Sequence, residues 1–404
     1  MLTFEYTAKD SKTGDKVQAE VQAESEQAAA KLISRQGLAP LEIRVKGEGS
    51  GPLSNFKNRV RTKDRVLFSR QLSTLLNAGL PLVQSLRTVA GQAQNKGMQM
   101  VINQVITDIE AGNSFSKALS AHPKVFNQVF TSLVASGESS GTLDKALERI
   151  ANQQEHDAEM ISKVRGAMVY PGIVLVVIIG VTIFMLRTVL PQVGILYKDL
   201  KKTLPPMTSF LLSISNAIGK YWFIFLIVIG IIIFFINRWR ETEAGRSTLD
   251  QLKMNMPLFK GMFMKLYMAR FCRTGTTLIA SGVPLLEMLR ITGSSVNNVH
   301  IENSIKSASE KVKSGKALSD CLTDDPNFLP LVPQMLKIGE TSGAMDQMLE
   351  KTATFYENEL DNEIKAITTT IEPILMVVMA VMVGFIVAAI LLPVYGLVNV
   401  TSLT

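Results

Sequence analysis

The sequence predicts a mainly α-helical, polytopic membrane protein with two repeated cytoplasmic helical bundles, three transmembrane helices and a small N-terminal α/β domain. Three observations predict this fold class: long apolar segments, a helical pattern that occurs twice, and strand-like alternation confined to the start of the chain. Hydrophobic residues make up 47% of the 404 residues and charged residues only 19%, and the mean hydropathy is +0.21. This balance indicates a protein that is partly embedded in lipid.

The first residues have the pattern of a small domain followed by a linker. Residues 2–8 and 16–23 alternate apolar and polar side chains as strands do, a helical pattern covers 25–37, and a short strand pattern follows. We therefore predict an α/β domain at 1–45. Residues 46–61 are rich in Gly, Ser and Asn, which predicts a linker.

The helical pattern beyond the linker occurs twice. FSRQLSTLLNAGLPLVQSLR begins at Phe68, and FCRTGTTLIASGVPLLEMLR begins at Phe271, an offset of 203 residues (271 − 68). Apolar residues recur with the helical period, and glycine and proline stop signals separate short helices, as in a bundle. We therefore predict one cytoplasmic bundle at 62–169 and a second at 238–370.

Each predicted bundle is followed by an apolar segment long enough to cross a bilayer, and a further such segment precedes the second bundle. The apolar cores of these segments contain no ionisable side chain, which argues against a transporter. The predicted membrane topology is a transmembrane helix at 170–190, an external or periplasmic loop at 191–217, transmembrane helices at 218–237 and 371–395, and an external tail at 396–404.

Charge and cysteine content bear on the compartment. Two similar bundles belong on one side of the membrane, and Lys and Arg near their ends of the spans favour the cytoplasm by the positive-inside rule. Three lysines (198, 201 and 202) weaken this asymmetry. We interpret the net charge of +7 as an excess of Lys and Arg that faces lipid and not as a nucleic-acid surface. The two cysteines fit a protein in a reducing compartment. The prediction is a multi-pass protein with a cytoplasmic N-terminus.

The segment SGESSGTLDKAL (136–147) contains a formal match to G-x-S-x-G, the turn that presents the nucleophile of serine hydrolases. In that alternative the protein is a membrane serine hydrolase that uses Ser139. The motif requires a preceding strand and a histidine partner, whereas the bundle setting predicts a helix here. The second copy has Thr341 in place of the serine. We therefore interpret the segment as a helix–helix connection.

In this interpretation a glycine ends one helix, a polar turn follows, and the next helix starts soon after. Glu138 and Glu340 are expected to cap the following helix or to pair with a basic side chain. Two alternatives stay open: an exposed acidic contact for a partner, or a divalent ion at a subunit interface. The predicted structural or interface turn residues are Gly79, Pro81, Gly137, Glu138 and Gly141 in the first copy, and Gly282, Pro284, Gly339, Glu340 and Gly343 in the second.

The turn at 137–142 precedes a segment that can run as nearly continuous helix from the bundle into the bilayer, and its counterpart does the same from Met345. Pro171 and Pro373 are expected to kink these helices at the water–lipid boundary without ending them. The sequence contains no phosphate-binding loop and no metal-ligand or C-x-x-C spacing. We therefore expect neither catalysis nor a cofactor or metal.

The duplicated bundle, the paired NAGLPL and ASGVPL turns, the paired GESSG and GETSG turns and the ending ILLPVYGL resemble the PilC/GspF family. Its members are inner-membrane platform proteins of bacterial type IV pilus and type II secretion machines. The resemblance covers nearly the whole chain, and FEYTAKDSKTGDKVQAEV near the start is similar to the family's small leading domain.

The resemblance implies a non-enzymatic scaffold. Its bundles would engage a hexameric motor ATPase, and its membrane helices would engage pilin or pseudopilin transmembrane helices and other inner-membrane assembly subunits. We expect a homo-oligomer, because a motor with several subunits acts on a central body. The main interpretation is a platform for assembly of a type IV pilus, and the alternative is the equivalent platform of a type II secretion pseudopilus. The sequence does not distinguish twitching pili, DNA-uptake pili and secretion.

Overall fold

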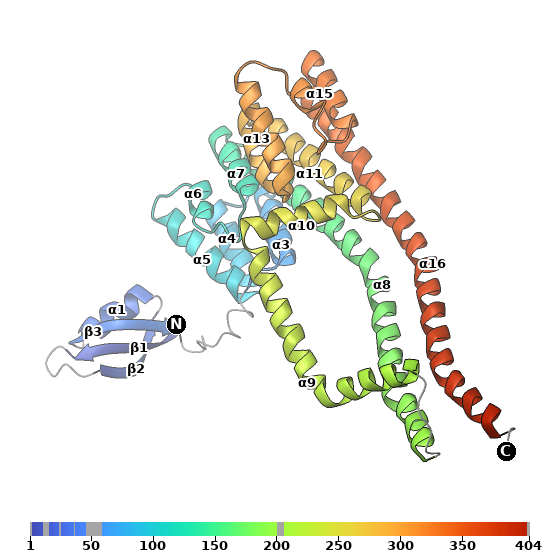
Figure 1. Ribbon diagram of the computed structural model, residues 1–404. Coiled ribbons are helices and arrows are strands. Elements are labelled where there is room, and N and C mark those ends of the chain that lie inside the picture. The colour runs from blue at the N-terminus through green and yellow to red at the C-terminus, as the bar shows by residue number, and fades with distance from the viewer. Residues whose placement is uncertain are drawn as a thin grey trace.

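The computed structural model describes residues 2–10, 16–23, 26–35, 37–45, 59–199 and 206–401. Most of the predicted linker, part of the predicted loop and the last three residues lie outside these ranges. The described chain is predominantly helical, and the helical pattern is duplicated as the sequence predicts (Figure 1).

The first described elements are three strands and one helix: β1 (Leu2–Asp10), β2 (Lys16–Ala23), α1 (Glu26–Arg35) and β3 (Leu38–Val45). The sheet is antiparallel with the order β2-β1-β3. Tyr6, Ala8 and Ile33 form its buried cluster. The register between β1 and β3 shifts after Thr7, where Ala8 lies opposite Pro40. Proline has no backbone N–H to give to the ladder, and such positions favour irregular pairing.

The first bundle contains six helices: α3 (Thr62–Asn77), α4 (Leu82–Gln92), α5 (Lys96–Glu110), α6 (Phe115–Ser120), α7 (Gln128–Ser140) and the first part of α8 (Leu143–Asp199). Aromatic rings form the centre of its core. The ring of Phe126 lies 5.4 Å from that of Phe68 and 4.9 Å from that of Phe130, measured between centroids.

The second bundle repeats this order with α11 (Lys260–Ala280), α12 (Leu285–Val296), α13 (Val299–Lys313), α14 (Leu318–Leu322), α15 (Leu331–Ser342) and the first part of α16 (Met345–Thr401). An additional helix, α10 (Glu243–Asn255), precedes it. Phe271 and Phe328, the counterparts of Phe68 and Phe126, again pack with ring centroids 5.3 Å apart. One hydrophobic core cluster includes buried residues of both bundles.

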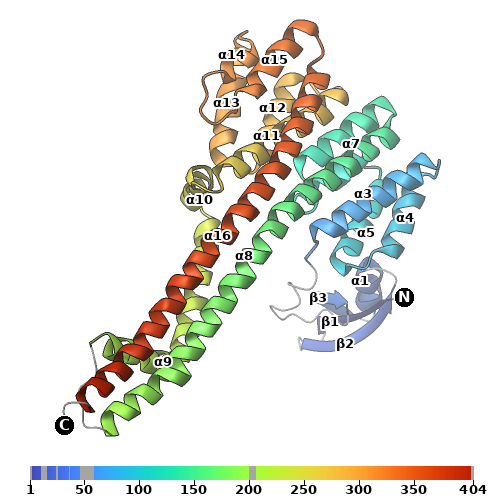
Figure 2. The same cartoon turned by 90° about the vertical axis from the view of Figure 1, so that its right-hand side faces the viewer.

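Helices α8 and α16 each contain 57 residues, about 85 Å at the usual helical rise of ~1.5 Å per residue. Both leave the bundles and run side by side (Figure 2). They continue through Pro171 and Pro373 without a break. The hydroxyl of Thr182 lies 2.6 Å from the sulfur of Met382, which joins the two helices far from the bundles. We call α8 and α16 the stalk helices.

Among the residues that the structure describes, two helices, both of them stalk helices, are long and apolar enough to cross a membrane. In the most apolar segment of α8 only 11% of the residues are buried, and in that of α16 only 6%. The third predicted span lies within α9 (Pro206–Arg240), whose backbone leaves the helical conformation at Tyr221. Beyond Tyr221, α9 carries exposed apolar side chains at Phe223, Ile224 and Ile227 and again from Val228 to Ile236.

The segment 191–217, predicted as an external or periplasmic loop between spans, is mostly helical in the structure. Helix α8 continues to Asp199, and α9 already begins at Pro206. Apolar packing explains this extension: Leu190 is buried against Leu186 and Leu212. At Gly194 a Cβ atom would lie only 3.0 Å from the side chain of Leu212, so the absence of a side chain lets the two helices approach closely.

Candidate functional site at the repeated turns and the bundle joint

The turn that leads into each stalk helix has a left-handed glycine. Gly141 has φ 69° and ends α7, and Gly343 has φ 70° and ends α15. The N–H of Thr142 donates to the carbonyl oxygen of Gly137 at 2.9 Å, which closes the first turn. Glycine suits this position because other residues rarely adopt positive φ. The connection is shorter than predicted, because each helix extends three residues beyond the glycine that was expected to end it.

Gly137 and Gly339 therefore lie inside helices and serve a different purpose. A Cβ atom at Gly137 would lie 2.5 Å from the Cβ of Ala146, and one at Gly339 would lie 2.9 Å from the Cα of Met345. Both distances are too short for a real contact. The absence of a side chain allows each stalk helix to pack closely against the helix before it.

The turns at Gly79 and Gly282 are also equivalent. These glycines have φ of 84° and 80°. Pro81 and Pro284 occupy the N-cap positions of α4 and α12, both with φ −58°. Proline costs no hydrogen bond at the start of a helix, so the pair ends one helix and starts the next.

The two glutamates of the repeated motif cap short helices. Glu138 accepts hydrogen bonds from the backbone N–H of Phe115 (2.7 Å) and from the N–H and hydroxyl of Ser116 (3.2 and 2.7 Å). Glu340 accepts the equivalent bonds from Leu318 and Ser319, the first at 2.6 Å. These residues begin α6 and α14, which precede the glutamates in the sequence. The expectation that the glutamates cap the following helix is therefore wrong.

The electrostatics of this cap favour a carboxylate. Burial alone would raise the pKa of Glu138, but the hydrogen bonds from the Ser116 hydroxyl and from the N–H groups of Phe115 and Ser116 outweigh it, and the pKa lies below its usual range. A negative charge at the start of a helix also meets the positive end of the helix dipole.

Ser139 does not have the surroundings of a hydrolase nucleophile. It lies in α7, is exposed, and its hydroxyl donates to the carbonyl oxygen of Ala135 at 2.8 Å. The segment before it is a helix and not the strand that a nucleophile elbow requires. Within the described part of the chain, no three His, Cys, Asp or Glu side chains gather where they could hold a metal ion.

A repeated ion pair also fixes each stalk helix to its bundle, and our sequence analysis missed it. Arg70 of α3 binds Glu155 of α8, and Arg273 of α11 binds Glu357 of α16 at 2.7 Å. The first pair is about 40% exposed (38% and 41%), and the second only 14% and 17%. Comparison of the two copies at the repeat offset could have found both pairs.

The two bundles are held together by a polar joint between α7 and α8 on one side and α11 on the other. The hydroxyl of Ser136 donates to the carbonyl oxygen of Ser281 at 2.6 Å, and Arg149 donates to the carbonyl oxygen of Ala280 at 2.5 Å. The amide of Gln153 accepts from the Thr277 hydroxyl at 3.0 Å. Further along the stalks, Lys163 of α8 pairs with Asp361 of α16 at 2.8 Å.

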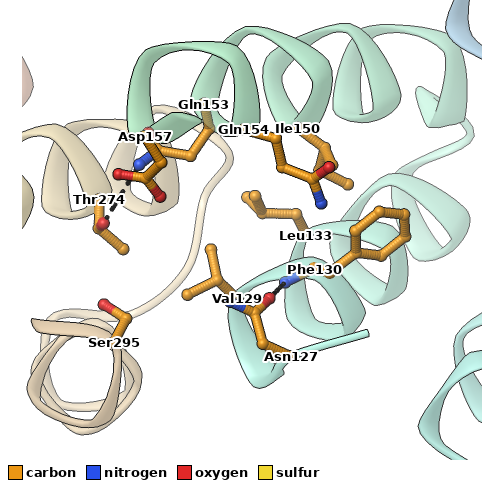
Figure 3. A pocket seen from close by; sticks show the side chains of 10 residues that line it. All are labelled: Asn127, Val129, Phe130, Leu133, Ile150, Gln153, Gln154, Asp157, Thr274 and Ser295. Carbon is orange, nitrogen blue, oxygen red and sulfur yellow. Dashed lines mark hydrogen bonds between the residues drawn. The ribbon is translucent and has the colours of Figure 1, made fainter. Parts of the chain in front are cut away.

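A small cavity of about 50 Å³ lies at this joint (Figure 3). Gln153 reaches from α8 to Thr274 of α11, with 3.4 Å between the amide nitrogen and the hydroxyl. Asp157 lies on the same side of α8, and its carboxylate is 4.0 Å from the Arg270 guanidinium. The cavity is too small for a cofactor. Its polar side chains come from both bundles, so we interpret it as part of the contact between them. Its other lining residues are Asn127, Val129, Phe130, Leu133, Ile150, Gln154 and Ser295.

Comparison with known proteins agrees with the duplicated architecture. The family model for type II secretion system (T2SS) protein F matches residues 68–191 and again residues 271–393, and the model for the N-terminal domain of that protein matches residues 1–44. The chain belongs to the type II secretion system protein F family. The resemblance to PilC/GspF proteins is thereby confirmed.

Relatives of this family member come from both kinds of machine. The type IV pilus assembly protein PilC of Thermus thermophilus is 37% identical over 407 residues, with all of both chains covered. PilC of Myxococcus xanthus is 35% identical, covering 96% of this chain and 93% of the relative. The type II secretion system protein F of Aeromonas hydrophila is also 35% identical, covering 92% and 97%.

Proposed function

We propose that this protein is a non-enzymatic platform of the bacterial inner membrane that serves type IV pilus biogenesis. It couples a cytoplasmic motor ATPase to the insertion of pilins into the filament. The observation that carries the proposal is mechanical: two bundles are joined to each other, and each is continuous with a stalk helix whose far part exposes apolar side chains. The names of full-length relatives, pilus assembly proteins among them, support it.

A continuous helix transmits displacement well, because its backbone hydrogen bonds run along its whole length. Here the base of each stalk helix is fixed at several points: the left-handed glycine turn, the glutamate cap and the ion pair of α8 or α16 with the bundle. Lys163–Asp361 and Thr182–Met382 link the stalks to each other. Movement of a bundle would therefore move the membrane part.

In the proposed membrane arrangement α8, α9 and α16 all span the bilayer, the N-terminus and both bundles are cytoplasmic, and the connection between α8 and α9 faces outward. Exposed apolar side chains along all three helices support it, since water-exposed surfaces rarely carry so many. Cysteine labelling of intact cells tests it. Ser209→Cys near the start of α9 should react with an impermeant maleimide, whereas Ser120→Cys and Ser314→Cys should react only after lysis.

The cytoplasmic bundles are the proposed contact for the hexameric motor, and the apolar faces of the membrane helices are the proposed contact for pilin helices and other assembly subunits. Glu138 and Glu340 are poor candidates for the motor contact, because their carboxylates are occupied by α6 and α14. The contact should involve exposed charges elsewhere on the bundles.

The motor contact is tested by co-purification. The tagged full-length protein, extracted from its own membranes, should retain the motor ATPase, and the purified protein alone should not hydrolyse ATP. ATP hydrolysis by the protein alone would contradict the non-enzymatic role. Absence of the motor from the extract would remove the coupling mechanism.

A type II secretion platform is the second candidate, because family members with that name are as similar to this chain as some of the pilus proteins. Deletion of the gene distinguishes the two: a pilus platform loses surface filaments, and a secretion platform loses exported proteins from the medium.

A further inference from the structure

The joint between the bundles connects two different faces. One face, which we call the α8 face, consists of Ser136, Arg149 and Gln153. The other, the α11 face, consists of Thr274, Thr277, Ala280 and Ser281, with Arg270 beside it. Each bundle contains an equivalent of both faces, because the bundles are repeats of each other. The internal contact is head-to-tail, so it uses the α8 face of the first bundle and the α11 face of the second. The equivalent of the α11 face in the first bundle and that of the α8 face in the second are left over.

The left-over faces follow from the repeat offsets. At the offset of 202 that relates Gly137 to Gly339, the α8 face corresponds to Ile338, Lys351 and Phe355, which we call the α16 face. At the offset of 203 that relates Phe68 to Phe271, Arg270 and the α11 face correspond to Leu67, Gln71, Thr74, Asn77 and Ala78, which we call the α3 face.

Both left-over faces expose large apolar side chains in the bundles, away from the apolar parts of the helices that would cross the membrane. Ile338 is 48% exposed, Phe355 47% and Leu67 45%. Ala78 and Lys351 are exposed as well. Thus the structure covers a face in one copy and leaves the corresponding face in the other copy open.

The residue changes on the two open faces are chemically matched at one end of the contact. Where the internal joint has Ser136 and Gln153, the α16 face has Ile338 and Phe355. Ser281, which faces Ser136, is replaced by Ala78 on the α3 face, and Arg270, which lies beside the joint and faces Asp157, is replaced by Leu67. At the Ser136–Ser281 contact a polar pair has become the apolar pair Ile338 and Ala78, whereas the equivalents of Thr274 and Thr277 stay polar. Leu67 and Phe355 each add an exposed apolar side chain, and burial of these apolar groups makes each face a fitting partner for the other.

We propose that the α16 face of one chain docks on the α3 face of a second copy and so repeats the internal joint between molecules. Phe355 would pack against the Leu67–Thr74 side of α3, and Ile338 against Ala78. Lys351 would replace Arg149 as the donor to a backbone carbonyl, here that of Asn77. The proposal assigns the expected self-association to these two faces. It does not depend on whether the machine builds a pilus or secretes protein.

Such a contact is heterologous, because the two faces differ, so it propagates from chain to chain. Attachment to one bilayer keeps all bundles at the same height. The repeated rotation therefore runs about an axis normal to the membrane, which favours a closed ring of alternating first and second bundles.

Site-directed cross-linking in membranes tests the contact. Two differently tagged full-length chains are co-expressed, one with Thr74→Cys and one with Phe355→Cys, both with Cys321→Ser because Cys321 is partly exposed. A short bismaleimide should give a covalent product that carries both tags. The control is Gln153→Cys with Thr277→Cys in one chain, the equivalent pair of the internal joint, which should cross-link within a single chain.

The outcomes separate clearly. If the internal pair cross-links and the mixed pair does not, the proposal is wrong. Cross-linking of Phe355→Cys to itself would indicate a symmetric contact and would also overturn it. In addition, Phe355→Glu should convert the detergent-extracted oligomer to monomer, whereas Met100→Glu, at a site that is similarly exposed (46%), should not. Equal effects of these two changes would contradict the assigned surface.

Discussion

Glu138 lies within 2.7 Å of the backbone nitrogen of Phe115, 23 residues earlier in the chain. Glu340 makes the same contact with the backbone nitrogen of Leu318 at 2.6 Å. In both copies a carboxylate from the last turn of one helix caps the start of an earlier one. The same last turn leads into the stalk helix, so the cap also fixes the position of the stalk base.

Glu138→Ala should destabilise α6, because the N–H groups of Phe115 and Ser116 lose their acceptor. Loss of a helix cap costs about 0.5–2 kcal/mol. Hydrogen exchange of the full-length protein should show faster exchange in residues 115–120. Ser139→Ala is the matched control, because its hydroxyl only bonds back to its own helix. Equal exchange in the two variants would contradict the capping role.

The cap should also weaken in acid. Because the pKa of Glu138 in the folded protein lies below its usual value of 4.5, its contribution is present above that value and is lost as the pH falls through the folded pKa. Helix α6 should exchange its amide hydrogens more slowly in the wild type than in Glu138→Gln, and this difference should be largest near neutral pH and shrink below about pH 4.5. A difference that stays constant down to strong acid would show that the charge contributes nothing.

Gly141→Ala should destabilise the base of the first stalk by about 1–2 kcal/mol, because φ is positive there and nothing else crowds the site. Gly91→Ala is the control: the site is equally open but lies in the regular helix α4, where alanine is favoured over glycine. Thermal unfolding in detergent should show a lower midpoint for the first variant only. A shift of the same sign in both would argue against the left-handed turn.

The two repeated ion pairs should differ in strength. Glu357→Gln removes the partner of the better-buried Arg273, and Glu155→Gln that of the more exposed Arg70. An exposed pair contributes up to about 1 kcal/mol, and a charge left unpaired on burial costs several times more. Chemical denaturation should therefore show the larger loss for Glu357→Gln. A larger loss for Glu155→Gln would contradict this order.

The sequence is sufficient to predict the duplication, the helical bundles and the long helices that follow them, because hydrophobic periodicity and glycine and proline stop signals are local features. It was not sufficient for the partner of Glu138, since a contact with Phe115 depends on how α6 and α7 are placed in space. The joint between Gln153 and Thr277 was missed for the same reason. The helical structure of the segment after residue 190 was not predicted, because it is stabilised by the packing of Leu190 and Gly194 on Leu212, a contact that composition alone does not indicate.

The most direct test of the central claim is to delete the gene in its own bacterium and to count surface filaments by electron microscopy, with pilin and motor ATPase followed by immunoblot. The account predicts that filaments disappear while pilin in the membrane and motor in the cytoplasm remain at wild-type levels, and that an intact copy of the gene restores them. For a secretion platform the corresponding loss is of exported proteins from the culture medium. Normal filaments together with normal secretion in the deletion strain would contradict the platform role.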